Sequence, residues 1–332
     1  MVIIRHGPAT GVMWLARLLL AVLAVLAGAG CTRAPEVPLR VGTHVWPGFE
    51  PLYLARQQGY YPSGSVRLVE YSSGSDAIQA FRAGAIDAEA LTLDEALLLA
   101  ETTPDLSVVL VLDVSNGGDV ILAQPARSSL RDLKGRRVGL EAGALGAYVL
   151  TRALQTVDLT PKDVVVVSLD SFEHERAFKE GRVDAVVTYE PTRTRLLAAG
   201  ARTLFDSSQI PGEIVDVLVV RRSFAAKHGE RVDELVRGWF RALDFIRADS
   251  RQAASLMARR EQLGADEFQK SLEGLRFYGI EENRSMLAGP APAIIPTARQ
   301  LSRVMIDNQL LKRAPEAREL IDGRFVERAA RP

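Results

Sequence analysis

The residues best suited to bind a small molecule lie in short loops that carry acids and aromatic rings but no basic side chain. After the first β-branched run comes Trp46-Pro47-Gly48-Phe49-Glu50-Pro51, a stiff turn with an indole and a carboxylate. After the second comes Ser72-Ser73-Gly74-Ser75-Asp76, whose hydroxyls and amides could cap a helix or hold a ligand's acceptor atoms. Capping needs only one hydroxyl, so the extra serines favour a binding site in this loop.

Four more loops have the same character: Leu91-Thr92-Leu93-Asp94, Asp113-Val114-Ser115-Asn116-Gly117-Gly118-Asp119, Glu141-Ala142-Gly143-Ala144-Leu145-Gly146 and Thr188-Tyr189-Glu190-Pro191. For each acid alone, a solvated turn residue or a helix N-cap is an equally good interpretation. As a set, the acids favour a site for a positive group, against which the aromatic rings could stack. The predicted ligand contacts are Trp46, Glu50, Ser73, Ser75, Thr92, Asp113, Asn116, Leu145, Tyr189 and Glu190.

No catalytic pattern is complete in the chain. His174-Glu175 lacks the second histidine of a zinc-protease helix. Gly143-Ala144-Leu145-Gly146 has neither the spacing of a dinucleotide fingerprint nor the Gly-Lys-Ser/Thr of a P-loop. No Gly-x-Ser-x-Gly elbow occurs, and the only cysteine, Cys31, has no partner base in the mature chain. We therefore predict a binding protein without cofactor or metal, and not an enzyme.

Between these loops, through two thirds of the chain, β-branched runs alternate with segments whose apolar residues have helical spacing. Such alternation indicates an α/β fold with parallel sheets and helices on their faces. In open sheets of this kind, ligands bind beyond the carboxyl ends of the strands, where helix N-termini point outward. The polar loops occupy those positions. The strand-like runs are Leu39–His44, Val66–Tyr71, Val108–Asp113, Val120–Ala123, Arg137–Leu140, Val164–Leu169, Val183–Tyr189 and Val215–Val220.

One nine-residue pattern occurs twice. Ala80-Phe81-Arg82-x-Gly84-x-Ile86-Asp87-Ala88 returns as Ala177-Phe178-Lys179-x-Gly181-x-Val183-Asp184-Ala185. In each copy an apolar pair and a cation end a helix, glycine caps it, and a β-branched residue opens a strand. Any two helix–turn–strand units can look alike, but the shared order favours two similar α/β lobes. A cleft between lobes is a common place for a small-molecule site.

After Arg221 the pattern becomes helical. An apolar stripe at helical spacing runs from Val232 to Ile246, so Trp239 and Phe240 are predicted core residues and not ligand contacts. Polar turns near Gln124 and Arg221 are the predicted crossings between lobes. The predicted organisation is a signal peptide at 1–30, a lipidated tether at 31–38, a discontinuous lobe 1 at 39–124 with 222–332, and lobe 2 at 125–221.

The N-terminus has the features of a secretory signal. Leu18–Ala29 is apolar but shorter than the roughly twenty residues that a membrane span requires. Basic residues precede this run and small residues follow it, which is typical of a cleaved export signal. Met13 is an alternative start, because the segment that begins there is already a complete signal.

The end of this segment, Gly28-Ala29-Gly30-Cys31, resembles a bacterial lipobox, in which the cysteine takes a diacylglyceryl group and becomes the mature N-terminus. The sequence departs from that pattern at Gly28, where leucine is preferred. Ordinary signal cleavage with an incidental cysteine is the alternative. Lipidation of Cys31 predicts a periplasmic or cell-envelope location with attachment to a membrane. A lone cysteine also predicts no disulfide framework.

The net charge of the chain limits the kinds of molecule that it is expected to bind. The whole chain has 41 basic and 41 acidic residues, and removal of residues 1–30 takes away two arginines and no acid. The mature chain is therefore slightly acidic. Nucleic acids and acidic surfaces are bound by basic fields, so they are not expected partners. We predict a monomer that binds a small molecule.

Several segments, in order, resemble ABC-transporter substrate-binding proteins of the nitrate/sulfonate/taurine and NMT1/THI5-like group. The resemblance is good over roughly Leu39 to Ser223 and looser over the helical third. The segments that carry it are Trp46-Pro47-Gly48, Pro51-Leu52-Tyr53-Leu54-Ala55, Gly59-Tyr60-Tyr61, Ser73-Gly74-Ser75, Gly84-x-Ile86-Asp87-Ala88, Leu133-Lys134-Gly135-Arg136-Arg137-Val138-Gly139 and Tyr189-Glu190-Pro191.

This resemblance implies a type II periplasmic-binding-protein fold, with two α/β lobes, two crossing segments and a ligand held by hinge closure. It also implies an ABC permease as the membrane partner. A sensing module for a membrane receptor is one alternative. A THI5-type pyrimidine-forming enzyme is another, although the cysteine-rich motif of that type is missing here. The acidic loops favour a neutral, zwitterionic or cationic nitrogen-containing ligand, while helix N-termini and hydroxyls could still hold an anion.

Overall fold

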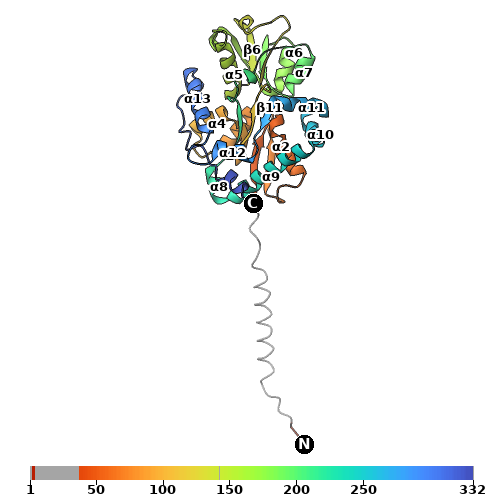
Figure 1. Ribbon diagram of the computed structural model, residues 1–332, viewed down its shortest axis with the longest axis vertical. Helices are drawn as coiled ribbons and strands as arrows, with labels where there is room; N and C mark the ends of the chain where they lie inside the picture. Colours follow the sequence, from red (N-terminus) through yellow and green to blue (C-terminus); the bar gives the residue numbers. More distant parts are fainter. Residues whose placement is uncertain (1, 4–36, 142, 332) are drawn as a thin grey trace. The chain divides into compact units, whose positions relative to one another are not determined.

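Two β-sheets, flanked by helices, organise the chain in the computed structural model (Figure 1). The structure describes residues 2–3, 37–141 and 143–331. Apart from residues 2–3, the predicted signal peptide lies outside the described residues, as do the predicted lipidation site Cys31 and most of the predicted tether. No helix in the described part is long and apolar enough to cross a membrane.

The first sheet has six strands in the order β11-β4-β10-β3-β1-β2. β1 is parallel to both β2 and β3, whereas β10 is antiparallel to β3 and β4. Every residue of β3, β4 and β10 is buried, as expected for strands with neighbours on both sides and helices on both faces. The strands are β1 (Leu39–Thr43), β2 (Val66–Glu70), β3 (Ala88–Thr92), β4 (Ser107–Ser115), β10 (Val215–Val220) and β11 (Leu275–Phe277).

The second sheet has five strands in the order β7-β6-β8-β5-β9. β6 is parallel to β7 and β8, and β5 is antiparallel to β8 and β9. In each sheet, parallel strands therefore pair with an antiparallel strand that arrives from the other sheet, and the first sheet has a further antiparallel strand, β11, at its edge. The strands are β5 (Val120–Ala123), β6 (Arg137–Leu140), β7 (Val165–Ser168), β8 (Ala185–Thr188) and β9 (Arg202–Asp206).

The positions at which the chain changes sheet differ from those predicted. The first change lies between β4 and β5, and the second between β9 and β10, before the expected crossings near Gln124 and Arg221. β5 thus belongs to the second sheet and β10 to the first. A β-branched run identifies a strand but does not reveal its neighbours, and both strands pair on two sides with partners distant in sequence. The sheets are also mixed, and not purely parallel.

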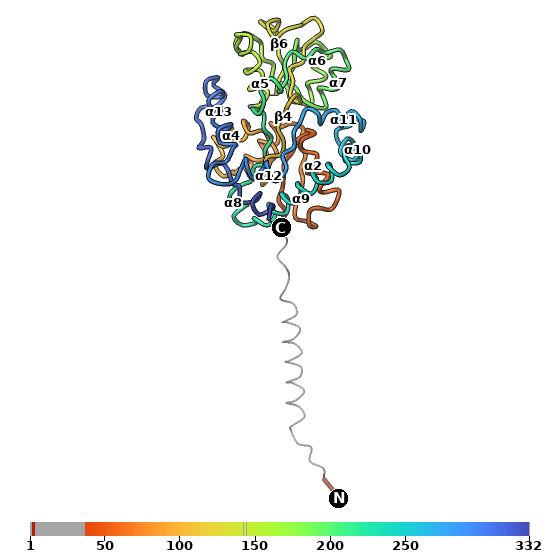
Figure 2. Tube along the Cα trace, viewed as in Figure 1, coloured from red at the N-terminus to blue at the C-terminus, as the bar shows by residue number. Residues whose placement is uncertain are grey.

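The helical last third packs on the first sheet. In Figure 2 the trace after β10 returns to the part of the fold formed by the early strands, while the middle of the chain surrounds the second sheet. The predicted stripe lies on the long helix α9, where Val232, Leu235, Trp239 and Leu243 are buried, so this core prediction is confirmed.

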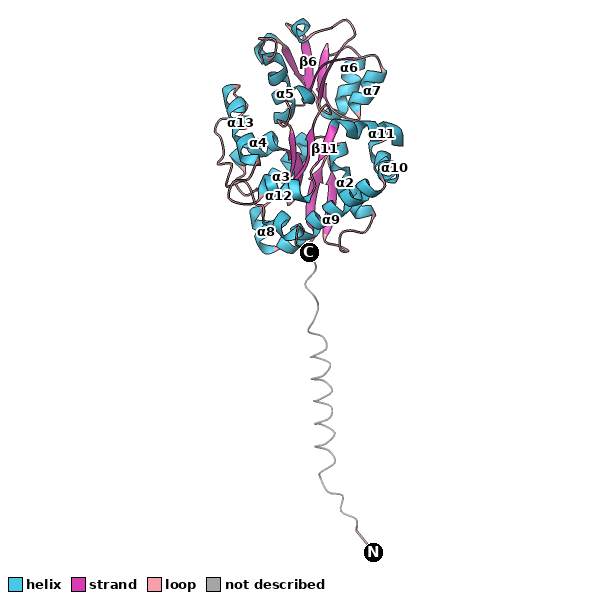
Figure 3. Cartoon of the chain, in the orientation of Figure 1, coloured by secondary structure: helices cyan, strands magenta, loops and turns pink. Residues whose placement is uncertain are grey.

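Helices cover the faces of both sheets (Figure 3). Those of eight residues or more are α2 (Glu50–Gln57), α3 (Gly74–Arg82), α4 (Leu93–Thr102), α5 (Ala144–Gln155), α9 (Gly229–Ala248), α10 (Ser250–Glu261), α12 (Ile280–Leu287) and α13 (Ile294–Asp307). The shorter ones are α6 (His174–Lys179), α7 (Thr192–Ala198), α8 (Arg222–Lys227), α11 (Ala265–Ser271) and α14 (Arg324–Ala329).

The repeated sequence pattern has a repeated structure. Arg40 of β1 donates to Asp87 from its backbone N and Nε, and to a glycine carbonyl from its guanidinium. Arg137 of β6 makes the same set of bonds to Asp184 and to the second glycine. Both aspartates lie 47 residues after their arginine. The glycines, Gly84 and Gly181, end α3 and α6 at φ values of 75° and 67°, a region that favours glycine.

Candidate functional site

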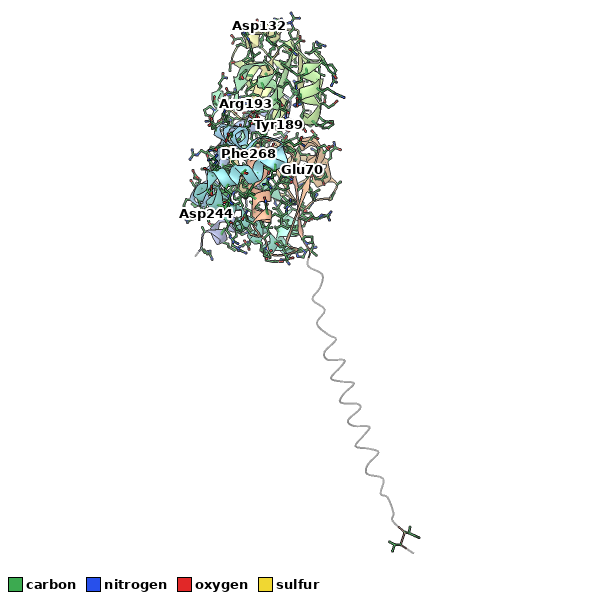
Figure 4. The ribbon with its side chains drawn as sticks, turned by 90° about the vertical axis from the view of Figure 1, so that its right-hand side faces the viewer. Glu70, Asp132, Tyr189, Arg193, Asp244 and Phe268 are labelled. Atoms are coloured by element: carbon green, nitrogen blue, oxygen red, sulfur yellow. The ribbon has the colours of Figure 1, made fainter. Side chains whose placement is uncertain are left out.

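The carboxyl ends of the parallel strands of both sheets meet around one cavity. It contains about 580 Å³ of empty space, part of it continuous with solvent. Figure 4 shows Tyr189, which lines the cavity, between the part of the fold that carries Asp132 and the part that carries Asp244. The lining residues are His44, Trp46, Gly74, Thr92, Glu95, Asp119, Glu141, Gly143, Leu145, Gly146, His174, Val187, Thr188, Tyr189 and Asp216.

Four of the ten predicted ligand contacts line this cavity: Trp46, Thr92, Leu145 and Tyr189. Two more lie beside it. The backbone N of Ser75 donates to the lining residue Glu141. Asp113 is buried and interacts electrostatically with the lining residue Asp216. The loops selected from the sequence therefore converge, although they come from both sheets.

The other four predicted contacts have different surroundings. Glu50 is buried against Arg260, whose Nε lies 3.1 Å from its carboxylate. Glu190 accepts bonds from Arg193 and from the backbone N of Thr194, so it caps α7. Ser73 caps α3 through a bond from the backbone N of Asp76. Asn116 is exposed, and its backbone N donates to the carbonyl of Gly274.

Several lining residues are absent from the predicted contacts. Asp119 and Glu141 belong to the polar loops named above. His44 follows β1 directly and could have been found by the same rule of strand ends. Glu95 and Asp216 lie inside α4 and β10, so a search of loops misses them. For Asp216 the signal is a lone acid within an otherwise apolar strand.

Burial and neighbouring acids raise the pKa values of Glu95, Asp119 and Asp216. Burial raises the pKa of Asp119 to about 7. Burial, together with the charges of Asp94 and Glu141, raises the pKa of Glu95 to about 8. Burial and the neighbouring Asp113 raise the pKa of Asp216 well above its ordinary value. Burial lowers the pKa of His44 to about 4, so its imidazole is neutral at pH 7.

The cavity therefore presents acids and neutral polar groups. Its described lining includes four carboxyl side chains and no lysine or arginine. The buried Nδ1 of His44 and Oγ of Ser75 have no hydrogen-bond partner, which leaves them free to bond a ligand because buried polar atoms are normally paired. Among the described residues, no cluster of three or more histidine, cysteine or acidic side chains could hold a metal ion.

Contacts between the two sheets' loops close one side of the cavity. Glu141 Oε1, after β6, lies 2.7 Å from the backbone N of Ser75, after β2. The ring of Tyr189, after β8, packs against His44 at 5.9 Å and edge-on against Trp46 at 5.7 Å. Aromatic rings at this separation and angle attract each other. The described conformation is thus one in which the two sheets' loops touch.

Comparison with known proteins places the chain in a family. The sequence model of the NMT1-like family matches residues 32–260, more than half of the chain. The chain belongs to the NMT1-like family. The match covers both sheets except β11, as well as α8, α9 and most of α10.

One relative is a protein of Escherichia coli (strain K12) provisionally named an aliphatic sulfonates-binding protein. It is 26% identical to this NMT1-like chain over 203 residues, which are 60% of this chain and 63% of the relative. The aligned part thus spans less than two thirds of that relative's length. A provisionally named binding protein of Brucella abortus (strain 2308) is 23% identical over 68% of this chain and 72% of its own length.

Solved structures show the fold. The ligand-binding component of an ABC-type import system from Staphylococcus aureus, with zinc bound, has a TM-score of 0.75 at 16% identity over 90% of this chain and 100% of its own. The alkanesulfonate-binding protein of Xanthomonas axonopodis pv. citri, bound to MOPS, has a TM-score of 0.70 at 20% identity over 89% and 98%. The predicted periplasmic-binding-protein fold is confirmed.

The desulfurization enzyme DSZB shares this fold, with a TM-score of 0.62 at 16% identity over 87% of this chain and 98% of its own. The fold alone therefore does not separate binding proteins from enzymes. The relatives named above carry the names of binding proteins. Whether this chain is a binding protein or an enzyme has to be judged from the residues of its own cavity.

Proposed function

We propose that this protein captures a small nitrogen-containing cation or zwitterion in the cavity between its sheets and delivers it to an ABC importer in the membrane. Family membership and the fold support a role as solute-binding component, since two of the three solved structures named above are described as import or binding proteins. The ligand class rests on the cavity itself.

The observation that carries the ligand class is the acidic lining. Glu95, Asp119, Glu141 and Asp216 surround the space, and none of the described lining residues is a lysine or arginine. An anionic ligand would have to enter beside these groups without a cationic partner, which is unfavourable in a buried site. A bound ammonium or amidinium group would instead relieve the repulsion among the acids.

Aromatic side chains support the same ligand class. Trp46 is 4% exposed and, together with Tyr189, forms one wall of the cavity. Indole and phenol rings attract cations through their negative faces. A planar amidinium or aminoheterocycle would thus find both a stacking surface and charge partners. The sulfonates in the names of two relatives carry the opposite charge, so we do not extend their ligand to this chain.

We also propose that the two sheets, each with its helices, act as lobes that open and close around the ligand. The two crossings, between β4 and β5 and between β9 and β10, would serve as the hinge. The bond between Glu141 and Ser75 and the ring contacts of Tyr189 would form on closure. Closure would present both lobes together to the permease.

Export through residues 1–30, lipidation at Cys31 and a monomeric state complete the proposal. A non-enzymatic role is supported by the chemistry of the cavity: the only cysteine of the chain precedes the described fold, and both histidines in the lining have lowered pKa values because they are buried. Mass spectrometry of the membrane-extracted protein would detect the diacylglyceryl group on Cys31.

A binding screen with the chain that starts after Cys31 tests the function. The panel contains polyamines, guanidino compounds, amino acids and aminopyrimidines, with alkanesulfonates and nitrate as the anionic arm. A ligand at a hundred times its dissociation constant stabilises the protein by about 2.7 kcal/mol, which thermal unfolding detects readily. Stabilisation by nitrogenous cations or zwitterions alone supports the proposal. Stabilisation by sulfonates or nitrate alone would overturn the ligand class.

A further inference from the structure

The N-terminus of α3 lies in the wall of the cavity. α3 begins after Ser73, which serves as N-cap. The first N–H groups of a helix have no partner inside the helix and carry the positive end of its dipole. Ser73 Oγ accepts from Asp76 N, which leaves the N–H of Ser75 directed elsewhere. Such N–H groups bind phosphate, sulfate or carboxylate oxygens in many proteins.

A carboxylate of the chain itself already occupies that position. Oε1 of Glu141 lies 2.7 Å from the N of Ser75, a short bond between residues 66 positions apart in the sequence. Oε2 of the same carboxylate lies 3.5 Å from the hydroxyl of Tyr189. Glu141 follows a strand of the second sheet, whereas α3 packs on the first, so this contact joins the two sheets.

A second carboxylate of the first sheet's side lies close to the second sheet. A Cβ added to Gly143, the residue before α5, would be 3.2 Å from Glu95 Oε1. The other carboxyl oxygen of Glu95 accepts from the backbone N of Thr92, so Glu95 caps its own helix α4. Glu141 is therefore the acid that reaches a helix N-terminus of the other sheet, and Glu95 adds a second carboxyl beside it.

We propose that Glu141 is a built-in anion that fills the α3 N-terminus on closure and makes the cavity selective against anionic ligands. This inference rests on the proposed role as a binding protein. When the lobes close, the carboxylate takes the place that a sulfonate or phosphate oxygen would occupy. Its carboxylate then lines the cavity beside the carboxyl of Glu95, and a cationic ligand is favoured.

Substitution of Glu141 tests the inference with ethanesulfonate as the probe. Glu141→Ala removes the carboxylate and opens the N–H of Ser75, so ethanesulfonate should bind about tenfold to a hundredfold more tightly than to wild type, the range for a hydrogen bond to a charged group. Glu141→Gln keeps a carbonyl oxygen that accepts from Ser75, so it should not gain ethanesulfonate binding. Glu180→Ala removes an exposed carboxylate that does not line the cavity and serves as control.

Isothermal calorimetry on the chain that starts after Cys31 gives the affinities, and circular dichroism verifies folding of each variant. Gain of ethanesulfonate binding by Glu141→Ala alone supports the inference, even if no amine binds wild type and the proposed ligand class fails. Equal affinity of wild type and Glu141→Ala for ethanesulfonate would overturn it. So would failure of folded Glu141→Ala to bind the anion, even where amines bind wild type and the proposed function stands.

Discussion

Asp113 of β4 and Asp216 of β10 are direct partners in the antiparallel ladder beneath the cavity. Both are buried. Burial raises the pKa of Asp113 to about 7, and burial with the neighbouring Asp113 raises that of Asp216 well above its ordinary value. Two carboxylates this close cannot both ionise without strong repulsion, so the pair retains a proton at neutral pH.

This pair predicts a stability that falls as pH rises. Below the ordinary aspartate pKa both folded and unfolded chains are protonated; above it the unfolded chain loses its proton first, so unfolding becomes easier between about pH 4 and 7. Asp113→Asn should flatten this fall. It should be more stable than wild type at pH 8, by a few kcal/mol at most since one pKa unit corresponds to about 1.36 kcal/mol.

Urea unfolding of the ligand-free protein at several pH values measures this effect. Asp132→Asn is a matched control, because Asp132 is partly exposed and its pKa is lowered by bonds from the backbone N–H groups of Ser128 and Ser129. The control should show no gain at pH 8. A wild-type stability that does not change between pH 4 and 7 would contradict the shared-proton interpretation.

Cation binding should strengthen as pH rises. The raised pKa values of Glu95, at about 8, and Asp119, at about 7, mean that these acids are partly protonated in the empty cavity. A ligand with a permanent positive charge favours their ionised forms and releases protons on binding. Its affinity should increase between pH 5 and 8, by up to about tenfold per pH unit for each proton released.

Calorimetry in buffers of different ionisation enthalpy counts those protons. For a hit such as a quaternary amine, the observed heat should depend on the buffer at pH 6.5. Heats that are equal in all buffers, with an affinity independent of pH, would show that the acids do not titrate on binding.

Trp46→Ala should weaken binding of a cationic ligand by about 1–2 kcal/mol, the usual value of a cation–π contact in a desolvated site. Trp46→Phe should lose less, because a smaller ring remains. Trp239, a buried residue of α9, is the other tryptophan of the described part. Ligand titration of Trp239→Phe should still change the tryptophan fluorescence, whereas titration of Trp46→Phe should not.

Glu213, in the crossing between β9 and β10, predicts the opposite pH dependence. Its carboxylate accepts from Tyr148 at 2.6 Å and from Arg152 at 2.7 and 2.9 Å. Although burial raises its pKa, these bonds to Arg152 and Tyr148 outweigh burial and lower the pKa below the ordinary value. Its stabilisation is present above the unfolded-state pKa and is lost as pH falls through the folded-state pKa.

Glu213→Gln should therefore destabilise the protein by roughly 1–3 kcal/mol at pH 7 and by less near pH 3.5. Thermal unfolding at the two pH values provides the measurement. Lys134, which forms only an exposed pair with Asp163, offers a control in Lys134→Gln. A loss for Glu213→Gln no larger than for the control would exclude a structural role for this crossing contact.

The fold could be predicted from the sequence because its signals are local. β-branched runs and the stripe on α9 reflect burial of each segment's own side chains. The sheet membership of β5 and β10 depends on partners elsewhere in the chain. No local pattern reports those partners, so the crossings predicted from the sequence lie later in the chain than the observed ones.

The residues of the candidate site also include some that the sequence predicts and some that it does not. Trp46, Thr92 and Tyr189 follow the rule that ligands meet strand ends. Glu50 satisfies that rule equally well, yet its partner is Arg260, 210 residues away in the sequence. Glu95 lies within a helix, and its proximity to Gly143 depends on how the two sheets are arranged. Loop chemistry therefore predicted the region, while long-range packing decides the individual residues.

The paired Arg40 and Arg137 bonds have a consequence for how the site can change. In the first sheet they join the start of β1 to the residue before β3, and in the second sheet the start of β6 to the residue before β8. These strand ends lie opposite the cavity. Counted from these arginines, His44 and Glu141 hold corresponding places, one a neutral ring and the other a charge. The scaffold is thus nearly twofold, but its binding surface is not. We expect a bound ligand to meet two unlike faces, and substitutions at these two places to alter selectivity while the framework stays intact.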